Sequence, residues 1–477
     1  MVLIINTYPF KYKGKVIRVK MSKLGHRPKV LIVGGSFAGL ATARYLKSSY
    51  DVTIIEPKDY FEYTPGVLHL LTGSNACEHL LSPMSIVAQG ATHTKGLFYG
   101  FNPKSKKALI KLLNEEGMWR ELNYDAIVLC HGIPYTIPIR ASPSNGNTLN
   151  SRINEIQSYC NKYKNAESIV VVGGGLVGVE FAAELAVRCK NAKTYIITKE
   201  NILATLPQSA GQYASKWLQK NNVKVYEDDV IKEYNPNLKT IVTAKGISIS
   251  SDVVVDCTGS NFVNIEGNVK SKWDNMEIPS NYVSDGFIKY TSGSSPFVPV
   301  NEYLMHKDYP SDGIFAAGDI LEFTFGVGLL SSSSKSGDIG NKSKLPAIRN
   351  AHLAESQAEL CAHNIVKYLK NENNYLTYPA GVFGVPNQPL LSCVSLGPYN
   401  GIIVFNNIVL GGILFGLLGG LMKFIVERSK IAEIRNKLWG RLFWAFGHVV
   451  SNFLSKLQFL FYKMKQKMIN NKSLKVA

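Results

Sequence analysis

Two glycine-rich segments have the residue types and spacing of a phosphate-binding turn. The first, Gly34–Gly39 (GGSFAG), follows the apolar run Val30–Val33, and the second, Gly173–Gly178 (GGGLVG), follows Ile169–Val172. A β-strand that turns through glycines into a helix presents bare backbone N–H groups and the positive end of a helix dipole to a pyrophosphate. One such motif is weak evidence, but two in one chain, about 140 residues apart, predict two dinucleotides bound side by side.

The first segment is followed by acidic residues where a dinucleotide needs them. Glu56 ends the next apolar run about 20 residues after the first glycine, where a carboxylate accepts hydrogen bonds from a ribose. Asp319 stands just past another predicted strand, 313–317. Ser36 replaces the second glycine of the motif, and its hydroxyl is itself a phosphate donor. The predicted contacts of the first dinucleotide are Gly34, Gly35, Ser36, Phe37, Ala38, Gly39, Glu56, Gly132, Gly318 and Asp319.

The second segment predicts a nicotinamide dinucleotide but leaves its type open. An acid at the end of the following strand would favour NADH, because it binds the ribose 2′-hydroxyl and repels a 2′-phosphate. Thr198 and Lys199 occupy that end, and Glu200 follows. Lys199 fits either a contact to a 2′-phosphate or a solvated loop lysine. The predicted contacts are Gly173, Gly175, Val177, Gly178, Thr198, Lys199 and Gly259.

Charge is concentrated at the two ends of the 477-residue chain. Residues 1–29 hold eight Lys/Arg and no acid, and residues 423–477 hold twelve Lys/Arg against two Glu, which accounts for the net charge of +18. The fold between them is electrically balanced, so nucleic acid is an unfavoured partner, and basic ends with aromatics fit an anionic membrane surface better. The seven cysteines are scattered without close pairs, which predicts no metal site and a reducing compartment.

The order of predicted strands indicates an α/β fold with two Rossmann-like dinucleotide-binding domains, the second inserted in the first. A basic extension occupies residues 1–28, and the first domain comprises 29–154 and 283–370. The inserted domain spans 155–282, and a C-terminal α+β region with amphipathic basic helices spans 371–477.

In combination, these motifs resemble the pyridine nucleotide–disulfide oxidoreductase superfamily of flavoproteins. Segments 59–66 (DYFEYTPG), 395–398 and 401–405 further resemble the group of apoptosis-inducing-factor homologues that includes the ferroptosis suppressor proteins, with type II NADH dehydrogenases next. The resemblance covers roughly residues 29–460. It implies FAD at the first glycine turn and NADH or NADPH as electron donor at the second.

The resemblance also implies roles for individual residues. The carboxylate matching Glu180 lies near the nicotinamide, and the acid matching Asp319 binds the ribityl chain. Residues 351–357 (AHLAESQ) are similar to the stretch with which type II NADH dehydrogenases face flavin and quinone. Gln357 would hydrogen-bond flavin or quinone, and His352 is either a proton donor to the reduced quinone or a surface histidine. Glu184, one turn after Glu180, is expected to form a surface salt bridge.

No Cys-x-x-x-x-Cys pair follows Glu56; only Cys77 lies in that region. The sequence pattern therefore disfavours a reductase that shuttles electrons through a disulfide, and we expect electrons to leave the flavin directly for an acceptor.

The C-terminal sequence predicts where that acceptor lies. Residues 408–422 are nearly all apolar or Gly, but Asn406, Asn407 and two glycine pairs favour a strand, a turn and a short helix over a membrane-spanning helix at 402–422. Apolar residues then recur at three-to-four spacing over 438–460, with basic flanks. This stripe favours a helix lying in the headgroup plane. Docking onto the protein's own core and a homodimer interface are the alternatives.

The sequence therefore predicts an FAD-dependent NAD(P)H:quinone oxidoreductase that reduces a lipid quinone at a membrane surface without pumping protons. The expected location is peripheral, on a mitochondrial membrane or on the cytoplasmic face of another organelle or a lipid droplet. The rival functions are a signalling or DNA-binding flavoprotein like apoptosis-inducing factor, and a respiratory type II NADH dehydrogenase.

Overall fold

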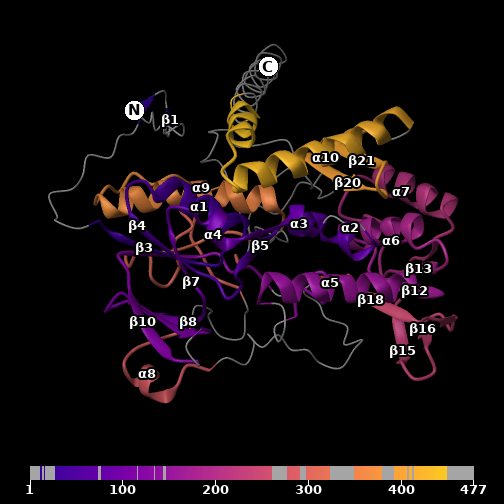
Figure 1. Ribbon diagram of the computed structural model, residues 1–477, viewed down its shortest axis with the longest axis horizontal. Coiled ribbons are helices and arrows are strands. Elements are labelled where there is room, and N and C mark those ends of the chain that lie inside the picture. The colour runs from indigo at the N-terminus through magenta and orange to yellow at the C-terminus, as the bar shows by residue number, and fades with distance from the viewer. Residues whose placement is uncertain are drawn as a thin grey trace, which may run out of the picture.

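The computed structural model describes most of the chain between residues 27 and 449 (Figure 1). The described residues are 11–12, 15–16, 27–73, 77–114, 117–133, 135–142, 147–259, 277–289, 297–322, 349–378, 391–405, 408–410, 413–447 and 449. Most of the basic N-terminal extension and the end of the apolar stripe lie outside them.

The first glycine turn belongs to a five-stranded parallel sheet with the order β19-β11-β3-β4-β7. Its strands are short and rich in β-branched residues, and the inner ones are buried, as expected of a sheet covered on both faces. They are β3 (Lys29–Val33), β4 (Asp51–Ile55), β7 (Thr92–Thr94), β11 (Ala126–Leu129) and β19 (Ile314–Ala316). Helices α1 (Phe37–Leu46) and α9 (Ala351–Leu369) pack against each other beside this sheet (Figure 1).

The second glycine turn belongs to a four-stranded parallel sheet with the order β14-β13-β12-β18. Its strands are β12 (Ser168–Val172), β13 (Lys193–Ile197), β14 (Lys224–Tyr226) and β18 (Val253–Asp256). All four lie between β11 and β19 in sequence, so one parallel sheet interrupts the other. The accompanying helices are α5 (Leu149–Lys164), α6 (Leu176–Arg188) and α7 (Gln208–Lys220). The predicted pair of Rossmann-like sheets is confirmed.

Antiparallel strands and short helices complete the two modules. One three-stranded sheet contains β8 (Gly96–Asn102), β9 (Lys107–Leu112) and β10 (Trp119–Asn123), and the other contains β15 (Ile231–Asn235), β16 (Thr240–Thr243) and β17 (Ser248–Ser250). The remaining small elements are β1 (Lys11–Tyr12), β2 (Lys15–Val16), β5 (Tyr60–Glu62), η1 (Thr64–Gly66), α2 (Val67–Leu71), α3 (Cys77–Leu80), β6 (Leu81–Pro83), α4 (Met84–Val87) and α8 (Ser280–Ser284).

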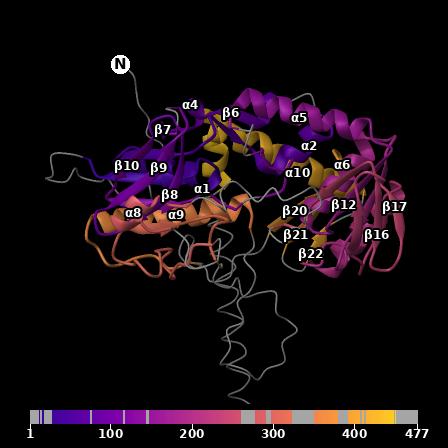
Figure 2. The ribbon, with the colours of Figure 1, turned by 90° about the horizontal axis from the view of Figure 1, so that it is seen from below.

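The C-terminal region begins with the antiparallel strands β20 (Leu391–Ser395), β21 (Gly401–Phe405) and β22 (Ile408–Leu410). The helix that follows, α10 (Ile413–Ile434), has 22 residues, so the expectation of a short helix is wrong. It runs from the second module toward α9 and lies between the two modules when the molecule is seen from below (Figures 1 and 2). No helix in the described part of the chain combines the length and the apolar character needed to cross a membrane.

The glycines of α10 explain the wrong prediction. A Cβ added to Gly419 would lie 3.2 Å from the Gly401 carbonyl carbon, and one on Gly420 would lie 3.2 Å from that of Tyr399. These glycines therefore allow the helix to approach the loop before β21 closely, and they do not interrupt it. Glycine costs a helix about 1 kcal/mol, which tertiary packing offsets here.

Candidate active site

The two glycine turns have nearly the same geometry. The first glycine has a positive φ in each, 106° at Gly34 and 109° at Gly173, and donates its N–H to the end of the neighbouring strand at 2.8 Å. The last glycine is closed against the first: an added Cβ would lie 1.9 Å from the carbonyl oxygen of Gly34 at Gly39, and 2.0 Å from that of Gly173 at Gly178. Both turns therefore need glycine at these positions.

The helices that follow the turns are open to an anion. Ser36 and Gly175 are the N-cap residues of α1 and α6, and neither forms a side-chain capping hydrogen bond. Neither helix has an acidic residue in its first turn. Open space within 4 Å surrounds a Cβ built on Gly175 or on Gly259, which faces the same strand ends. The turns thus fit diphosphate groups, with the N–H groups at the positive end of each helix dipole.

The predicted contacts of the first dinucleotide converge on the N-terminus of α1. Glu56 is buried, and its Oε2 accepts a hydrogen bond from the Gly35 N–H at 2.7 Å. Gly318 lies against Ala38, since an added Cβ would be 3.3 Å from the Ala38 Cβ. Asp319 therefore lies at the same strand ends, next in sequence to that contact.

Asp319 is held by two residues that the sequence did not single out. Tyr135 donates its hydroxyl to Asp319 Oδ2 at 2.8 Å, and the Arg349 Nε donates to the Asp319 carbonyl at 3.0 Å. Burial, followed by the charge of Asp319, raises the pKa of Tyr135, so this hydroxyl stays a donor over the physiological range. Gly132, with φ at 69°, lies three residues after the end of β11 and three residues before Tyr135.

Gln357 and His352 lie on α9 in different surroundings. Gln357 is buried; its Oε1 accepts from the Gly318 N–H at 2.8 Å, and its Nε2 donates to the Tyr378 hydroxyl at 3.1 Å. Both ends of this amide therefore have protein partners, and Gln357 fixes the loop that carries Asp319. His352 lies exposed in the first turn of α9.

Glu180 lies at the contact between α6 and the C-terminal region. Its Oε1 accepts hydrogen bonds from the Ser395 N–H and from the Lys423 ammonium, both at 2.7 Å. Glu184, one turn further, is fully buried and lies 2.8 Å from both His69 and Arg188. The expectation of a surface salt bridge at Glu184 is wrong, because α2 of the first module covers this face of α6.

Tyr63 connects these groups to the first module. It is buried, and its ring packs edge-on against Phe37, with 5.7 Å between the ring centroids. Burial raises its pKa above the ordinary value, and the carboxylates of Glu427, Glu355 and Glu180 raise it further. Residues from α1, α6, α9 and α10 thus meet around one tyrosine.

One face of the second half of α10 is paired with four other helices. The pairs, in order along α10, are Lys423–Glu180 of α6 (2.7 Å), Glu427–His79 of α3 (2.8 Å), Lys430–Glu355 of α9 (2.8 Å) and Glu433–Arg44 of α1 (2.8 Å). All the charged carboxylates in these pairs are shielded from solvent. The helix therefore connects both modules through its charged face.

The rest of the α10 surface after Gly416 is exposed and mostly apolar, with Arg428 over the ring of Phe424, and the exposure continues into the helical residues 438–447. The exposed apolar side chains are Leu417, Leu418, Leu421, Met422, Phe424, Ile425, Val426, Leu438, Trp439, Leu442, Phe443 and Phe446. We call this set the outer apolar face. Such a large apolar surface on a folded chain indicates a binding surface. The described apolar residues of the predicted stripe are exposed, so they do not dock onto the protein's own core.

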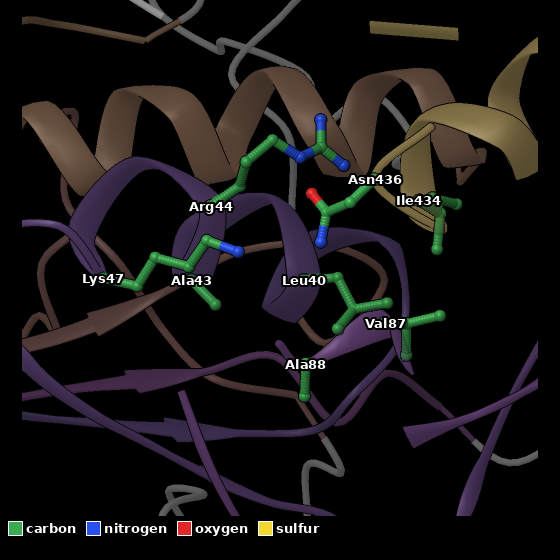
Figure 3. A pocket seen from close by; sticks show the side chains of 8 residues that line it. All are labelled: Leu40, Ala43, Arg44, Lys47, Val87, Ala88, Ile434 and Asn436. Carbon is green, nitrogen blue, oxygen red and sulfur yellow. The ribbon is translucent and has the colours of Figure 1, made fainter. Parts of the chain in front are cut away.

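A small pocket marks the place where the end of α10 meets α1. It is lined by Leu40, Ala43, Arg44, Lys47, Val87, Ala88, Ile434 and Asn436 (Figure 3). The lining includes none of the predicted dinucleotide contacts and combines residues of α1 and α4 with Ile434 and Asn436, so the pocket belongs to the contact between these helices.

The match to known proteins agrees with this geometry. Residues 28–358 match the family model of the pyridine nucleotide-disulphide oxidoreductases. The chain belongs to this family. It is an NAD(P)H-dependent oxidoreductase with FAD as its cofactor, as the two glycine turns predict.

Relatives of this oxidoreductase confirm the narrower resemblance. It is 24% identical to Apoptosis-inducing factor homolog B of Dictyostelium discoideum, over 51% of this chain and 70% of that one. It is 26% identical to Ferroptosis suppressor protein 1 of Taeniopygia guttata, over 61% and 73%. The structure of NDH2 from Plasmodium falciparum in complex with NADH covers 87% of this chain and 99% of its own, with a TM-score of 0.61 and 15% identity; at that identity the likeness concerns the fold.

The sequence missed Lys423, Tyr63 and Tyr135 as residues of this oxidoreductase's site. A signal existed for Lys423, because Lys423, Glu427 and Lys430 recur at helical spacing within an apolar segment. Cys130 is buried, and burial raises its pKa to about 12, so its thiol is an inert core group.

Proposed function

We propose that this oxidoreductase transfers two electrons from NAD(P)H to a lipid quinone at a membrane surface. The net reaction is NAD(P)H plus H⁺ plus quinone giving NAD(P)⁺ plus quinol. The observation that carries the proposal is α10, whose inner face reaches Glu180 through Lys423 while its outer face is apolar and exposed. Such a helix can contact the hydrocarbon of a membrane with one face and the candidate site with the other.

The residues around Tyr63 suit the binding and protonation of a quinone. Bound FAD would supply the two-electron carrier between the two substrates. Glu180 and Lys423 place a carboxylate and an ammonium group 2.7 Å apart near the start of α6, close to the second glycine turn. The ammonium can polarise a quinone carbonyl, and the Glu427–His79 pair (2.8 Å) lies one turn along α10 as a source of protons.

The outer apolar face supports a membrane as the second partner. Trp439 and Phe443 are aromatic residues of the kind that occupy the headgroup level, and the basic residues Lys437 and Arg441 flank them. A peripheral helix of this type positions the entrance of the site against the hydrocarbon, where a lipid quinone is dissolved.

The chemistry is tested with the full-length holoprotein. We expect NADPH or NADH to bleach the flavin absorbance, and a short-chain quinone to restore it faster than oxygen does. Lys423→Met should lower the rate of quinone reduction about tenfold, the equivalent of about 1.4 kcal/mol, without slowing the bleaching to the same extent. The quinone assignment fails if the reduced protein reacts with quinone no faster than with oxygen.

The membrane is tested by flotation with anionic vesicles. The double variant Leu421→Asp/Phe424→Asp should lose vesicle binding and keep its activity with a soluble quinone. Leu238→Asp is the matched control, because Leu238 is 71% exposed in the turn between β15 and β16, away from α10. If the double variant instead converts a dimer to a monomer and still binds vesicles, the outer apolar face is a homodimer interface.

A further inference from the structure

The two modules can be compared at the residue that follows their second strand. β4 pairs with β3, and β13 with β12, in equivalent registers, so that Ile55 lies opposite Val33 and Ile197 opposite Val172. The next residue is Glu56 in the first module and Thr198 in the second. Both are buried, with 6% exposure, and the two positions are structurally equivalent.

Each of these residues lies against the second glycine of its own turn. The Gly35 N–H donates to Glu56 Oε2 at 2.7 Å. In the second module, a Cβ added to Gly174 would lie 2.7 Å from the Thr198 Oγ1. The second module thus has the shorter, neutral hydroxyl of Thr198 where the first module has the carboxylate of Glu56, the predicted ribose ligand.

The substitution changes what the adenosine ribose can carry. A carboxylate at this position accepts hydrogen bonds from a 2′-hydroxyl and repels a 2′-phosphate. A threonine hydroxyl does not repel a phosphate, and it can donate a hydrogen bond to one. It also leaves the space that the longer acidic side chain fills in the first module.

Two lysines lie near the same strand end. Lys199 follows Thr198 directly, is exposed, and forms no ion pair among the described residues. Lys245 is linked to the same place through the backbone: its N–H donates to Asp229 Oδ1 (3.3 Å), and the Asp229 N–H donates to the Thr198 carbonyl (3.0 Å). Its ammonium binds the Glu227 carbonyl at 3.0 Å.

Four acidic residues lie nearby, and none of them takes the position of Glu56: Asp228 and Glu200 are exposed and lie beyond the ends of β14 and β13. Glu227 Oε1 accepts the Ile202 N–H at 2.8 Å, so this carboxylate binds the backbone of the following segment. Asp229 accepts the N–H groups of Val230 and Lys245. Glu200 is exposed and lies two residues after Thr198 in the sequence.

We propose that Thr198 and Lys199 make the second module select the 2′-phosphorylated ribose of NADPH over the free 2′-hydroxyl of NADH. The inference rests on the proposed function, in which the second glycine turn binds the electron donor. Lys199 supplies the charge-assisted hydrogen bond to the phosphate, and Thr198 removes the repulsion that an acid would exert.

The test uses half-ligands that carry no redox group, adenosine 2′,5′-bisphosphate and 5′-AMP, titrated into the FAD-loaded full chain by calorimetry. The wild type should bind the bisphosphate about tenfold more tightly than 5′-AMP. Lys199→Ala should abolish this preference and leave 5′-AMP binding unchanged. Thr198→Glu, which copies Glu56, should reverse it.

Lys193→Ala is the matched control, because Lys193 is an exposed lysine at the opposite end of the same strand, β13. It should retain the preference for the bisphosphate. Equal binding of the two half-ligands by the wild type overturns the inference, as does an equal loss in Lys193→Ala and Lys199→Ala, which would indicate general attraction to a basic protein. If neither half-ligand binds, the inference fails, and bleaching of the flavin by NADPH or NADH then shows separately whether the proposed function stands.

Discussion

The two dinucleotide-binding modules share their turns and differ in the residues around them. Gly34 and Gly173 have the same positive φ within 3°, and the last glycines close on the first at 1.9 and 2.0 Å. Two residues after the last glycine, however, the first module has the buried Ala41 and the second has Glu180. The backbone of both turns is thus suited to diphosphate in the same way, and the side chains outside the turns distinguish the two modules.

The difference continues one helical turn further along. Tyr45 in α1 corresponds to Glu184 in α6. Tyr45 packs beside the carboxylate of Glu359 on α9, whereas Glu184 is itself the carboxylate and pairs with His69 and Arg188. The two carboxylates differ in their surroundings: Glu184 is fully buried between His69 and Arg188, whereas Glu359 lies beside Tyr45, with Glu355 and Arg44 nearby.

The largest expected effect comes from a methyl group added to the last glycine of each turn. Gly39→Ala and Gly178→Ala both place a Cβ within 2.0 Å of a carbonyl oxygen, and the displacement of the turn should cost about 3 kcal/mol of dinucleotide binding. Gly39→Ala should purify without flavin colour. Gly178→Ala should remain yellow and bind NAD(P)H about 100-fold more weakly.

Visible absorbance and a titration with NAD(P)H separate the two variants. Circular dichroism of each variant shows whether the chain has folded. The assignment of one dinucleotide to each turn is contradicted if both folded variants lose flavin equally.

A second expected effect concerns the buried carboxylate of the second module. Burial opposes the ionisation of Glu184, but His69 and Arg188 hold its pKa below the ordinary value of 4.5. Glu184→Gln removes the buried carboxylate that pairs with the partly exposed His69 and Arg188, and it should lower the free energy of unfolding by about 2 kcal/mol at neutral pH. Because the lowered pKa stabilises the fold only above the ordinary pKa, the difference from wild type should shrink below about pH 4.5.

Urea denaturation at neutral and at acidic pH measures this difference. Glu121→Gln is the control, since it removes a more exposed pair with Lys107 (2.7 Å) and should cost less than about 1 kcal/mol. A loss at Glu184 no larger than that of the control would contradict the role of the buried pair.

The smallest expected effect has the opposite sign and concerns the first module. Burial raises the pKa of Glu359 to about 7, and the nearby Glu355 adds to the shift. Because the pKa of this carboxyl group is higher in the folded than in the unfolded chain, the group lowers the stability of the folded protein as the pH rises from 4.5 toward 7. Glu359→Gln should therefore stabilise the fold by about 1 kcal/mol above neutral pH and have no effect at acidic pH. Thermal unfolding of both proteins at acidic pH and above neutral pH measures this difference. An equal stability difference at both pH values would refute the prediction.

The glycine turns and Glu56 were predictable because local backbone chemistry fixes them. Gly34 needs a positive φ, and Glu56 follows the strand at the distance that the βαβ unit sets. The same local logic predicted two parallel sheets from two sets of β-branched runs.

Contacts across the chain were not predictable in this way. Lys423 and Glu180 are 243 residues apart, and no local pattern tells which helix a lysine of α10 will face. The place of Gln357 in a motif predicts a ligand contact, but its Oε1 accepts a hydrogen bond from the Gly318 N–H. The glycines of α10 were interpreted as breaks, because a sequence does not show which backbone packs against them.

The interruption of the first sheet has a consequence for how the protein is made. β19 joins β11 at the edge of that sheet, and residues 130–313 must leave the ribosome before it can do so. Asp319, which follows β19, and α9, which covers α1, are synthesised later still. The inserted module can thus mature while its host is still open, and the host becomes competent for its prosthetic group only near the end of translation.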